Sequence, residues 1–198
     1  MKKNTAVIVL VIALIVILIW GFSSYNGMVT EEETVDQTWA NVQNQYQRRS
    51  DLIPNLVQTV KGYSDHESST FQNVTEARAG LSKAYEEANA VVDPQNNIAQ
   101  FQKAQDQLKS ALGIYVNAVH EAYPDLKANE NFMNLQTQLE GTENRIATER
   151  TRYNEAVKNY NVKIRRFPAS VVAGITGFDK KEPFAADAEA QRAPKVQF

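Results

Sequence analysis

The stretch from Val35 to Tyr63 repeats a large apolar or amphipathic residue at alternating spacings of four and three. The positions that share this repeat are Val35, Trp39, Val42, Tyr46, Arg49, Ile53, Leu56, Val60 and Tyr63. A stripe that recurs about every 3.5 residues lies along one side of an α-helix, and other helices must run beside it to bury it. The stretch therefore predicts a long helix inside a helical bundle, with Arg49 within the stripe.

Pro54 is the one interruption of this predicted helix. Proline lacks an N–H donor and crowds the preceding turn, and the nearby Ser50 and Asp51 are favourable helix-start residues. We therefore expect a kink or a restart at this position, which would bend the helix around a core.

Three more helices with apolar stripes are predicted after Tyr63, with a reversal at about Val91–Asn97 and a helix end at Pro124. Whether the first two helices are continuous is left open by the sequence. The second stripe comprises Phe71, Val74, Arg78, Leu81, Tyr85 and Ala88. The third comprises Ile98, Phe101, Gln105, Leu108, Leu112, Tyr115, Val119 and Ala122. The fourth comprises Phe132, Leu135, Leu139, Thr142, Ile146, Glu149, Tyr153, Ala156 and Tyr160.

Polar residues within the fourth stripe require partners. A buried carboxylate such as Glu149 is stable only when it is paired, and Arg49, Arg78 or Arg145 is the expected partner. We interpret such a pair as a device that sets the register of the helices, in preference to a catalytic acid.

Composition limits the chemistry of the chain. Eight glycines and six prolines in 198 residues are few, as in helical proteins. There is no cysteine, which excludes disulfides and thiolate chemistry, and two histidines exclude an imidazole-rich metal site. A formal charge of -2 gives no electrostatic reason to bind nucleic acid. We expect no cofactor and no metal.

The amino end predicts a membrane anchor. Ala6 to Phe22 carries no charge over 17 residues, which would span roughly 25 Å as a helix, close to the apolar thickness of a bilayer. No small-x-small cleavage pattern follows this segment, since Ser24 would have Phe22 at minus three and Gly21 would have Ile19, so we favour a retained anchor over a cleaved leader. Lys2 and Lys3 predict a cytoplasmic amino end. The bundle is then expected on the periplasmic or extracellular side of an inner (cell) membrane.

These features predict an all-α fold with three parts: a transmembrane anchor at 1–25, a long antiparallel helical bundle at 26–166, and an irregular tail at 167–198. We expect a link at Tyr25–Glu33, flexible at Gly27, with Glu31, Glu32 and Glu33 near the positive end of the first bundle helix. The tail keeps four phenylalanines, so it is expected either to lie along the bundle or to dock into a partner.

Several blocks in fixed order resemble the LemA family of bacterial membrane-anchored helical proteins. They are the apolar amino segment, QRRSDLIPNLVQTVKGYSDHE at 47–67, TEARA at 75–79, the long block at 123–161, Phe167-Pro168 and the GF and AP-V-F elements of the tail. The resemblance implies an anchored antiparallel bundle without established enzyme activity. Its repeated polar positions correspond here to Arg48, Arg49, Asp51, Pro54, Asn55, His66, Glu67, Arg78, Glu143, Arg150, Tyr153 and Asn154. We interpret these, together with Glu149, as interaction or bundle-locking residues and assign no catalytic residue.

The function expected from the sequence is a non-enzymatic membrane-anchored scaffold or adaptor that binds other envelope proteins. One alternative is a signalling or hydrolytic enzyme that uses His66, although His66-Glu67 lacks a kinase phosphoacceptor context and a second histidine at zinc-protease spacing. A second alternative is a self-assembling protein that organises membranes.

Overall fold

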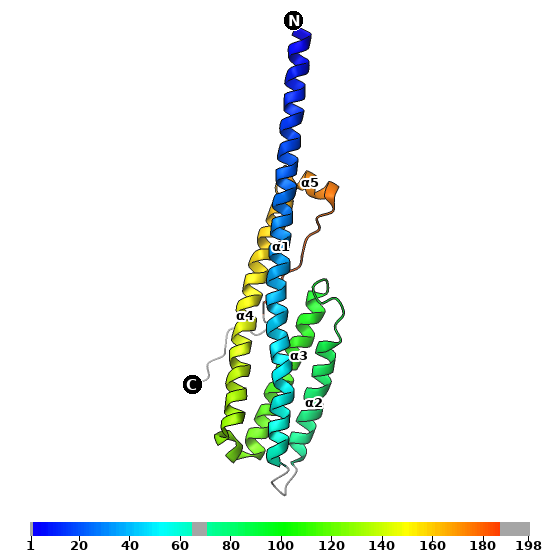
Figure 1. Cartoon of the computed structure of the whole chain (residues 1–198). Coiled ribbons are helices and arrows are strands. Elements are labelled where there is room, and N and C mark those ends of the chain that lie inside the picture. Colours follow the sequence, from blue (N-terminus) through cyan, green and yellow to red (C-terminus); the bar gives the residue numbers. More distant parts are fainter. Residues whose placement is uncertain (1, 65–70, 187–198) are drawn as a thin grey trace, which may run out of the picture. The chain divides into compact units, whose positions relative to one another are not determined.

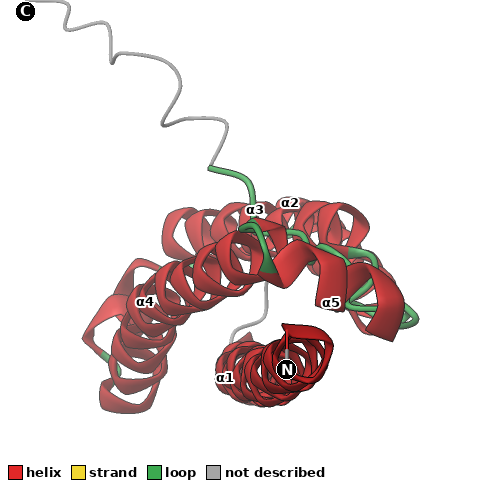
Figure 2. Ribbon diagram, turned by 90° about the horizontal axis from the view of Figure 1, so that it is seen from above, coloured by secondary structure: helices red, strands yellow, loops and turns green. Residues whose placement is uncertain are grey.

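The computed structural model describes residues 2–64 and 71–186 (Figure 1). Its elements are α1 (Lys2–Ser64), α2 (Gln72–Asn89), α3 (Ile98–Ala122), the 3-10 helix η1 (Pro124–Ala128), α4 (Glu130–Arg165) and α5 (Ala169–Thr176). Figure 2 shows helices and loops, and no strand occurs within the described ranges. The predicted all-α fold is confirmed.

Contacts along the backbone divide the chain into two compact units. The first unit contains α1 up to Ala40 and the segment Arg152–Pro183, which includes the end of α4 and the whole of α5. The second unit contains Asn41–Thr151 and the chain from Phe184 onward. α1 and α4 therefore each contribute residues to both units.

The second unit is built around the apolar stripes of its helices. α2 and α3 lie side by side (Figure 1), and one cluster of buried side chains joins α1, α2, α3, η1 and α4. Leu56, Leu108, Leu126 and Phe132 are fully buried in this cluster. Removal of such apolar area from water is the main favourable contribution to folding, so the stripes hold the unit together.

The predicted stripe of α1 is confirmed along its length. Val35, Val42 and Leu56 are fully buried, and Arg49 is only 2% exposed although it carries a charge. The stripe of α2 was predicted less well, because Arg78 is exposed. Phe71 adopts an extended backbone before α2 and is 40% exposed, so α1 and α2 are separate helices.

α1 does not restart at Pro54, which lies inside the helix. Ile53 and Leu56 are buried on either side of the exposed proline, and their packing in the core holds the helical backbone where local propensity favours an interruption. Of the expected kink or restart, the restart is therefore wrong, and the kink stays a prediction.

The predicted flexible link at Tyr25–Glu33 is also helical and belongs to α1. Met28 and Val35 are fully buried on either side of its end, and the hydroxyl of Thr30 donates to the Asn26 carbonyl at 2.9 Å. One glycine does not outweigh this packing. The three glutamates were expected to stabilise the start of a helix. Because α1 is continuous here, they lie in its middle, and that expectation is wrong.

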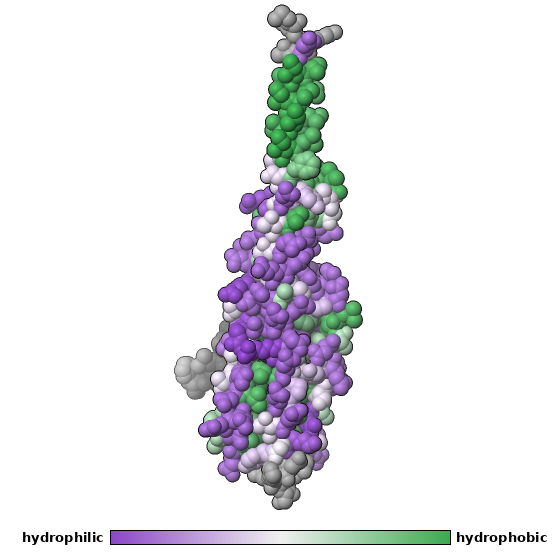
Figure 3. Space-filling view, in the orientation of Figure 1, coloured by the Kyte–Doolittle hydropathy of each residue, from purple (hydrophilic) through white to green (hydrophobic). Residues whose placement is uncertain are grey.

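The apolar segment at the start of α1 is exposed along its length, as its green surface in Figure 3 shows. Leu10 is 64% exposed, Ile17 is 66% exposed and Trp20 is 39% exposed. Among the described residues, α1 alone is long and apolar enough to cross a membrane, with a mean hydropathy of 3.1 and 0% burial over its most apolar 18 residues. The predicted transmembrane helix is thus supported by length and composition.

The segment after α4 was expected to be irregular, and it contains one short helix. α5 begins at Ala169 and ends at Thr176, and the φ of 80° at the next residue, Gly177, lies in the left-handed region that terminates helices. The chain from 178 to 186 has no regular secondary structure. The reversal predicted at Val91–Asn97 lies between α2 and α3 as expected.

We expect Leu108→Ala to lower the free energy of unfolding by about 3 kcal/mol, because a fully buried leucine leaves a cavity when it is shortened. Lys109→Ala alters the exposed next residue of α3 and serves as the control. Denaturant unfolding of the full chain in detergent, followed by circular dichroism, measures both variants. Equal midpoints for the two variants would contradict this packing.

Candidate interaction site along the carboxyl-terminal segment

The extended segment Asp179–Ala185, called the strap below, is fixed by side chains that bind its backbone. In the first unit, Asn161 on α4 donates from Nδ2 to the carbonyl of Lys181 at 2.8 Å. Its Oδ1 accepts the backbone N–H of the same lysine at 3.0 Å. A side-chain amide carries one donor side and one acceptor side, so Asn161 satisfies both backbone groups as a neighbouring strand would.

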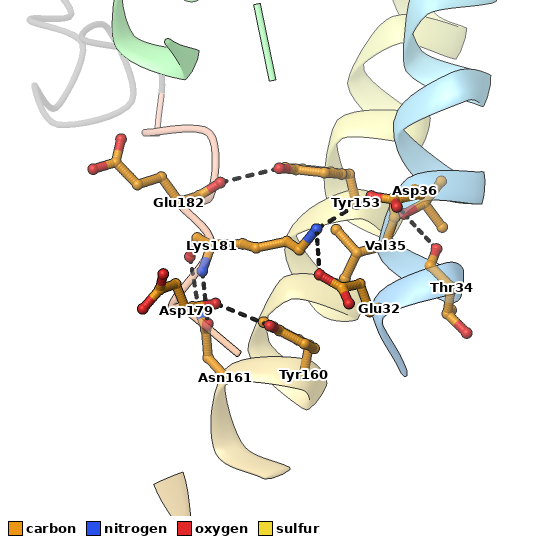
Figure 4. A network of polar contacts seen from close by, with 11 residues as sticks. Glu32, Thr34, Val35, Asp36, Tyr153, Tyr160, Asn161, Asp179, Lys181 and Glu182 are labelled. Atoms are coloured by element: carbon orange, nitrogen blue, oxygen red, sulfur yellow. Dashed lines mark hydrogen bonds and ion pairs between the residues drawn. The ribbon is translucent and has the colours of Figure 1, made fainter. Parts of the chain in front are cut away.

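Two tyrosines of α4 add hydrogen bonds to the strap (Figure 4). The Tyr160 hydroxyl donates to the Asp179 carbonyl at 2.9 Å, and the Tyr153 hydroxyl donates to the Glu182 carbonyl at 3.2 Å. Both tyrosines are fully buried. Burial, which disfavours the phenolate, and nearby carboxylates, among them Asp36, together raise the pKa of each to about 12. Both hydroxyls therefore keep the proton that the strap requires.

The side chain of Lys181 reaches across to α1. Its Nζ lies 3.2 Å from Glu32 and 3.3 Å from Asp36, as drawn in Figure 4. Lys163 on α4 forms a similar pair with Glu31 at 3.4 Å. Each pair is partly exposed and therefore contributes little alone. Together they explain why carboxylates occur in the middle of α1.

The second unit binds the end of the strap in the same way. Gln102 on α3 donates from Nε2 to the Ala185 carbonyl at 3.2 Å and accepts the Ala185 N–H at 3.0 Å. Arg150 donates to the same carbonyl at 3.0 Å, and its guanidinium lies 5.0 Å from the ring centroid of Phe184. Phe184 itself is 3% exposed beside Phe101. Backbone pairing and a buried aromatic ring thus hold the strap here.

A buried charge cluster lies deeper in the second unit. Arg49 donates from Nη1 to Glu143 on α4 at 2.8 Å. Its Nη2 donates to the Gln105 side chain and, at 3.3 Å, to the Gln105 carbonyl on α3. The guanidinium lies 5.1 Å from the ring centroid of Tyr46, whose pKa burial raises to about 12. A buried charge is stable only with such partners, so Arg49 fixes how α1, α3 and α4 meet.

The structure brings only some of the sequence-predicted site residues into these contacts. Arg49, Glu143, Arg150 and Tyr153 take part. Those that are exposed are Arg48, Asp51, Pro54, Asn55 and Arg78, and those that are partly buried on α4 are Glu149 and Asn154. His66 and Glu67 lie outside the described residues. Arg49, Arg78 or Arg145 was expected as the partner of Glu149, and the structure shows the ion pair of Arg49 with Glu143.

Sequence reasoning missed the two amides that bind the strap. Gln102 lies 83 residues before its partner and Asn161 lies 20 residues before its partner, and neither has a local signature. Tyr160 was predicted as a residue of the apolar stripe, but its hydrogen bond to the strap was not predicted. The side chains of Gln102, Tyr160 and Asn161 hold the backbone of the strap in place. Within residues 2–64 and 71–186, no three acidic or histidine side chains lie close enough together to form a metal site.

The fold and these contacts define an all-α protein with one candidate transmembrane helix at its amino end. The profile of the LemA family matches residues 38–198. The chain therefore belongs to the LemA family, and the resemblance read from its sequence is confirmed.

Curated relatives agree with this assignment. Magnetosome protein MamQ 2 of Paramagnetospirillum magneticum is 30% identical over 174 residues, which cover 81% of this chain and 64% of the relative. Magnetosome protein MamQ of Magnetospirillum gryphiswaldense is 28% identical over the same shares. Protein LemA of Metamycoplasma hominis is 24% identical over 148 residues, which cover 75% of this chain and 63% of the relative. The chain thus matches less than two thirds of the length of these relatives.

We expect Arg49→Met to lower the free energy of unfolding by about 3 kcal/mol, because Gln105 and Glu143 then lose the donor to which they are bonded. Arg48→Met is the matched control, since it removes the same charge from the exposed neighbouring position. Its effect should stay within about 0.5 kcal/mol. If denaturant unfolding showed the same loss of unfolding free energy for both variants, the buried contacts of Arg49 would not contribute more to stability than an exposed charge.

We expect the strap to dissociate from α4 at alkaline pH. The folded pKa of Tyr153 and of Tyr160 lies near 12, above the unfolded value of 10.0, so the native state binds these protons more tightly. Their contribution to stability is complete below pH 10 and decreases as the pH rises toward 12. Phenolate absorbance and unfolding midpoints across this range measure the effect.

The double variant Tyr153→Phe/Tyr160→Phe supplies the comparison for this titration. It should be less stable than the natural chain near neutral pH, because two hydrogen bonds to the strap are absent. It should also lose less stability between pH 10 and 12. Parallel pH profiles for the two proteins would be evidence against a role of these hydroxyls.

Proposed function

We propose that this LemA-family protein is a non-enzymatic, membrane-anchored helical scaffold or adaptor that binds other proteins of the cell envelope. The observation that carries the proposal is α1, one helix that starts as an exposed apolar segment and continues into buried stripe positions such as Val42 and Leu56. Such a helix joins a membrane span to a folded helical platform without a separate linker.

The use of the buried polar groups supports this proposal. Asn161 and Gln102 bind the chain's own backbone, and Arg49 binds side-chain and backbone oxygens of neighbouring helices. Each of these groups locks one segment to another, which a rigid platform requires. In this proposal Arg49, Glu143, Arg150 and Tyr153 are the bundle-locking residues.

An exposed face of α1 is the proposed protein-binding surface. Arg48, Asp51 and Asn55 are spaced by three and four residues, which places them on one side of the helix, and all three are exposed. Arg78 on α2 is exposed as well. The curated relatives are named as magnetosome or LemA proteins, and these names state no reaction. A partner recognised by charged and amide groups fits this face.

The proposal keeps the three-part division of the chain and its location. Residues 1–25 would be a single-pass anchor in the bacterial inner membrane, with the bundle at 26–166 on the periplasmic or extracellular side and the tail at 167–198 beyond it. The remaining family positions are Pro54, His66, Glu67 and Asn154. They and the stripe residue Glu149 are assigned to the same interaction or locking roles.

Site-specific photo-crosslinking in living cells tests the binding surface. A photo-reactive amino acid at Arg48 or Asn55 of the full chain should capture the same discrete envelope proteins from both positions. Lys109 on α3 is exposed and lies outside the proposed face, so it is the matched control position. Identical products from all three positions, or products only with random abundant proteins, would contradict a specific adaptor.

A further inference from the structure

α5 exposes apolar side chains to an unusual degree for a helix outside the anchor. Phe167 is 85% exposed, Val171 is 54% exposed and Ile175 is 81% exposed. Val171 and Ile175 are four residues apart, so they lie on one face of the helix. On the other side only Ala173 is buried, at 4% exposure. α5 therefore has an apolar face that residues 2–64 and 71–186 leave uncovered.

The position of α5 within the first unit indicates what covers this face. Phe178 follows the end of α5, and its ring centroid lies 5.5 Å from that of Tyr25 on α1. Tyr25 stands three residues beyond Phe22, the last residue of the apolar segment, a distance of roughly 4.5 Å along the helix axis. Figure 1 shows α5 beside the part of α1 that follows this segment. α5 thus lies at the level where the membrane span ends.

We propose that α5 lies in the interfacial layer of the membrane that α1 crosses, with the side chains of Phe167, Val171 and Ile175 among the lipids. This inference rests on the anchoring of α1 in the bilayer, as in the proposed function. A short apolar helix beside a span gains by burial of its uncovered face in the same bilayer. In this position the uncovered face of α5 would be buried in the same bilayer as the apolar segment of α1.

The charges around α5 fit such a position. Arg165 and Arg166 are exposed at the end of α4, directly before Phe167. Arginine side chains place an apolar stem in the membrane interface and extend the guanidinium to lipid phosphates. After α5, Gly177 turns the chain and the strap returns to α4, where Asn161 binds Lys181. Polar segments thus precede and follow the apolar helix.

Spin-label accessibility measures the depth of α5 directly. The natural chain has no cysteine, so a single cysteine carries the label without further changes. Val171→Cys and Ile175→Cys place labels on the apolar face of the full chain, reconstituted in vesicles of phosphatidylcholine and phosphatidylglycerol. Val16→Cys marks the span. Gln37→Cys marks an exposed site on α1, roughly 22 Å beyond Phe22.

The proposal expects the labels at 171 and 175 to collide more with oxygen than with a water-soluble nickel complex, as the label at 16 does. The label at 37 should show the opposite preference. Two exposed positions give independent readings, and circular dichroism checks that each variant is folded.

Three other outcomes overturn the inference. Aqueous values at 171 and 175 with a lipid value at 16 would leave the anchor intact and exclude α5 from the membrane. Low collision with both reagents, or spin–spin broadening, would mean that a protein surface, such as a second copy of this chain, covers α5. An aqueous value at 16 would contradict the anchor and hence the proposed function as well.

Discussion

Burial of one side of α1 is the constraint on which the rest of the structure depends. In the second unit Ile53 and Leu56 enter a core that α2, α3, η1 and α4 complete. In the first unit Trp39 packs against Tyr153 of α4, with ring centroids 5.5 Å apart. Because the same helix begins with an exposed apolar segment, the surface that organises the fold and the proposed anchor are parts of one element. The helix continues through Pro54 because these contacts outweigh the local cost of proline.

The strap shows how an extended segment becomes part of an all-α protein. A backbone without a neighbouring strand has unsatisfied donors and acceptors, and water usually supplies the partners. Here Asn161 and Gln102 supply them with paired amide bonds, and the hydroxyls of two buried tyrosines add more. Arg49 uses the same principle in the core, where a charge is held by an amide and a carboxylate. Apolar packing is not directional, so the hydrogen bonds of these polar side chains fix how the segments are aligned.

Periodicity in the sequence was sufficient to predict the helices and most of the buried stripe, including Arg49, because side-chain direction repeats with the helix. Turn-forming residues such as Asp93 and Pro94 predicted the reversal before α3. It failed where a tertiary contact decides the outcome. The continuity of α1 through Gly27 depends on packing of Met28 and Val35, and the partner of Arg49 depends on the register of α4. Gln102 has no local signal, since its partner lies 83 residues away. α5 was missed because eight residues between Pro168 and Gly177 give too short a pattern.

The central claim is that the stripe of α1 is buried by the other helices while its first part faces lipid. Hydrogen–deuterium exchange of the full chain in lipid nanodiscs, read by mass spectrometry, tests this most directly. The account predicts slow exchange at 42–60 of α1 and at 98–119 of α3, comparable with that of the lipid-embedded 6–22. Exchange at 42–60 as fast as that of an unprotected chain would contradict it, because an unpacked helix opens freely to water.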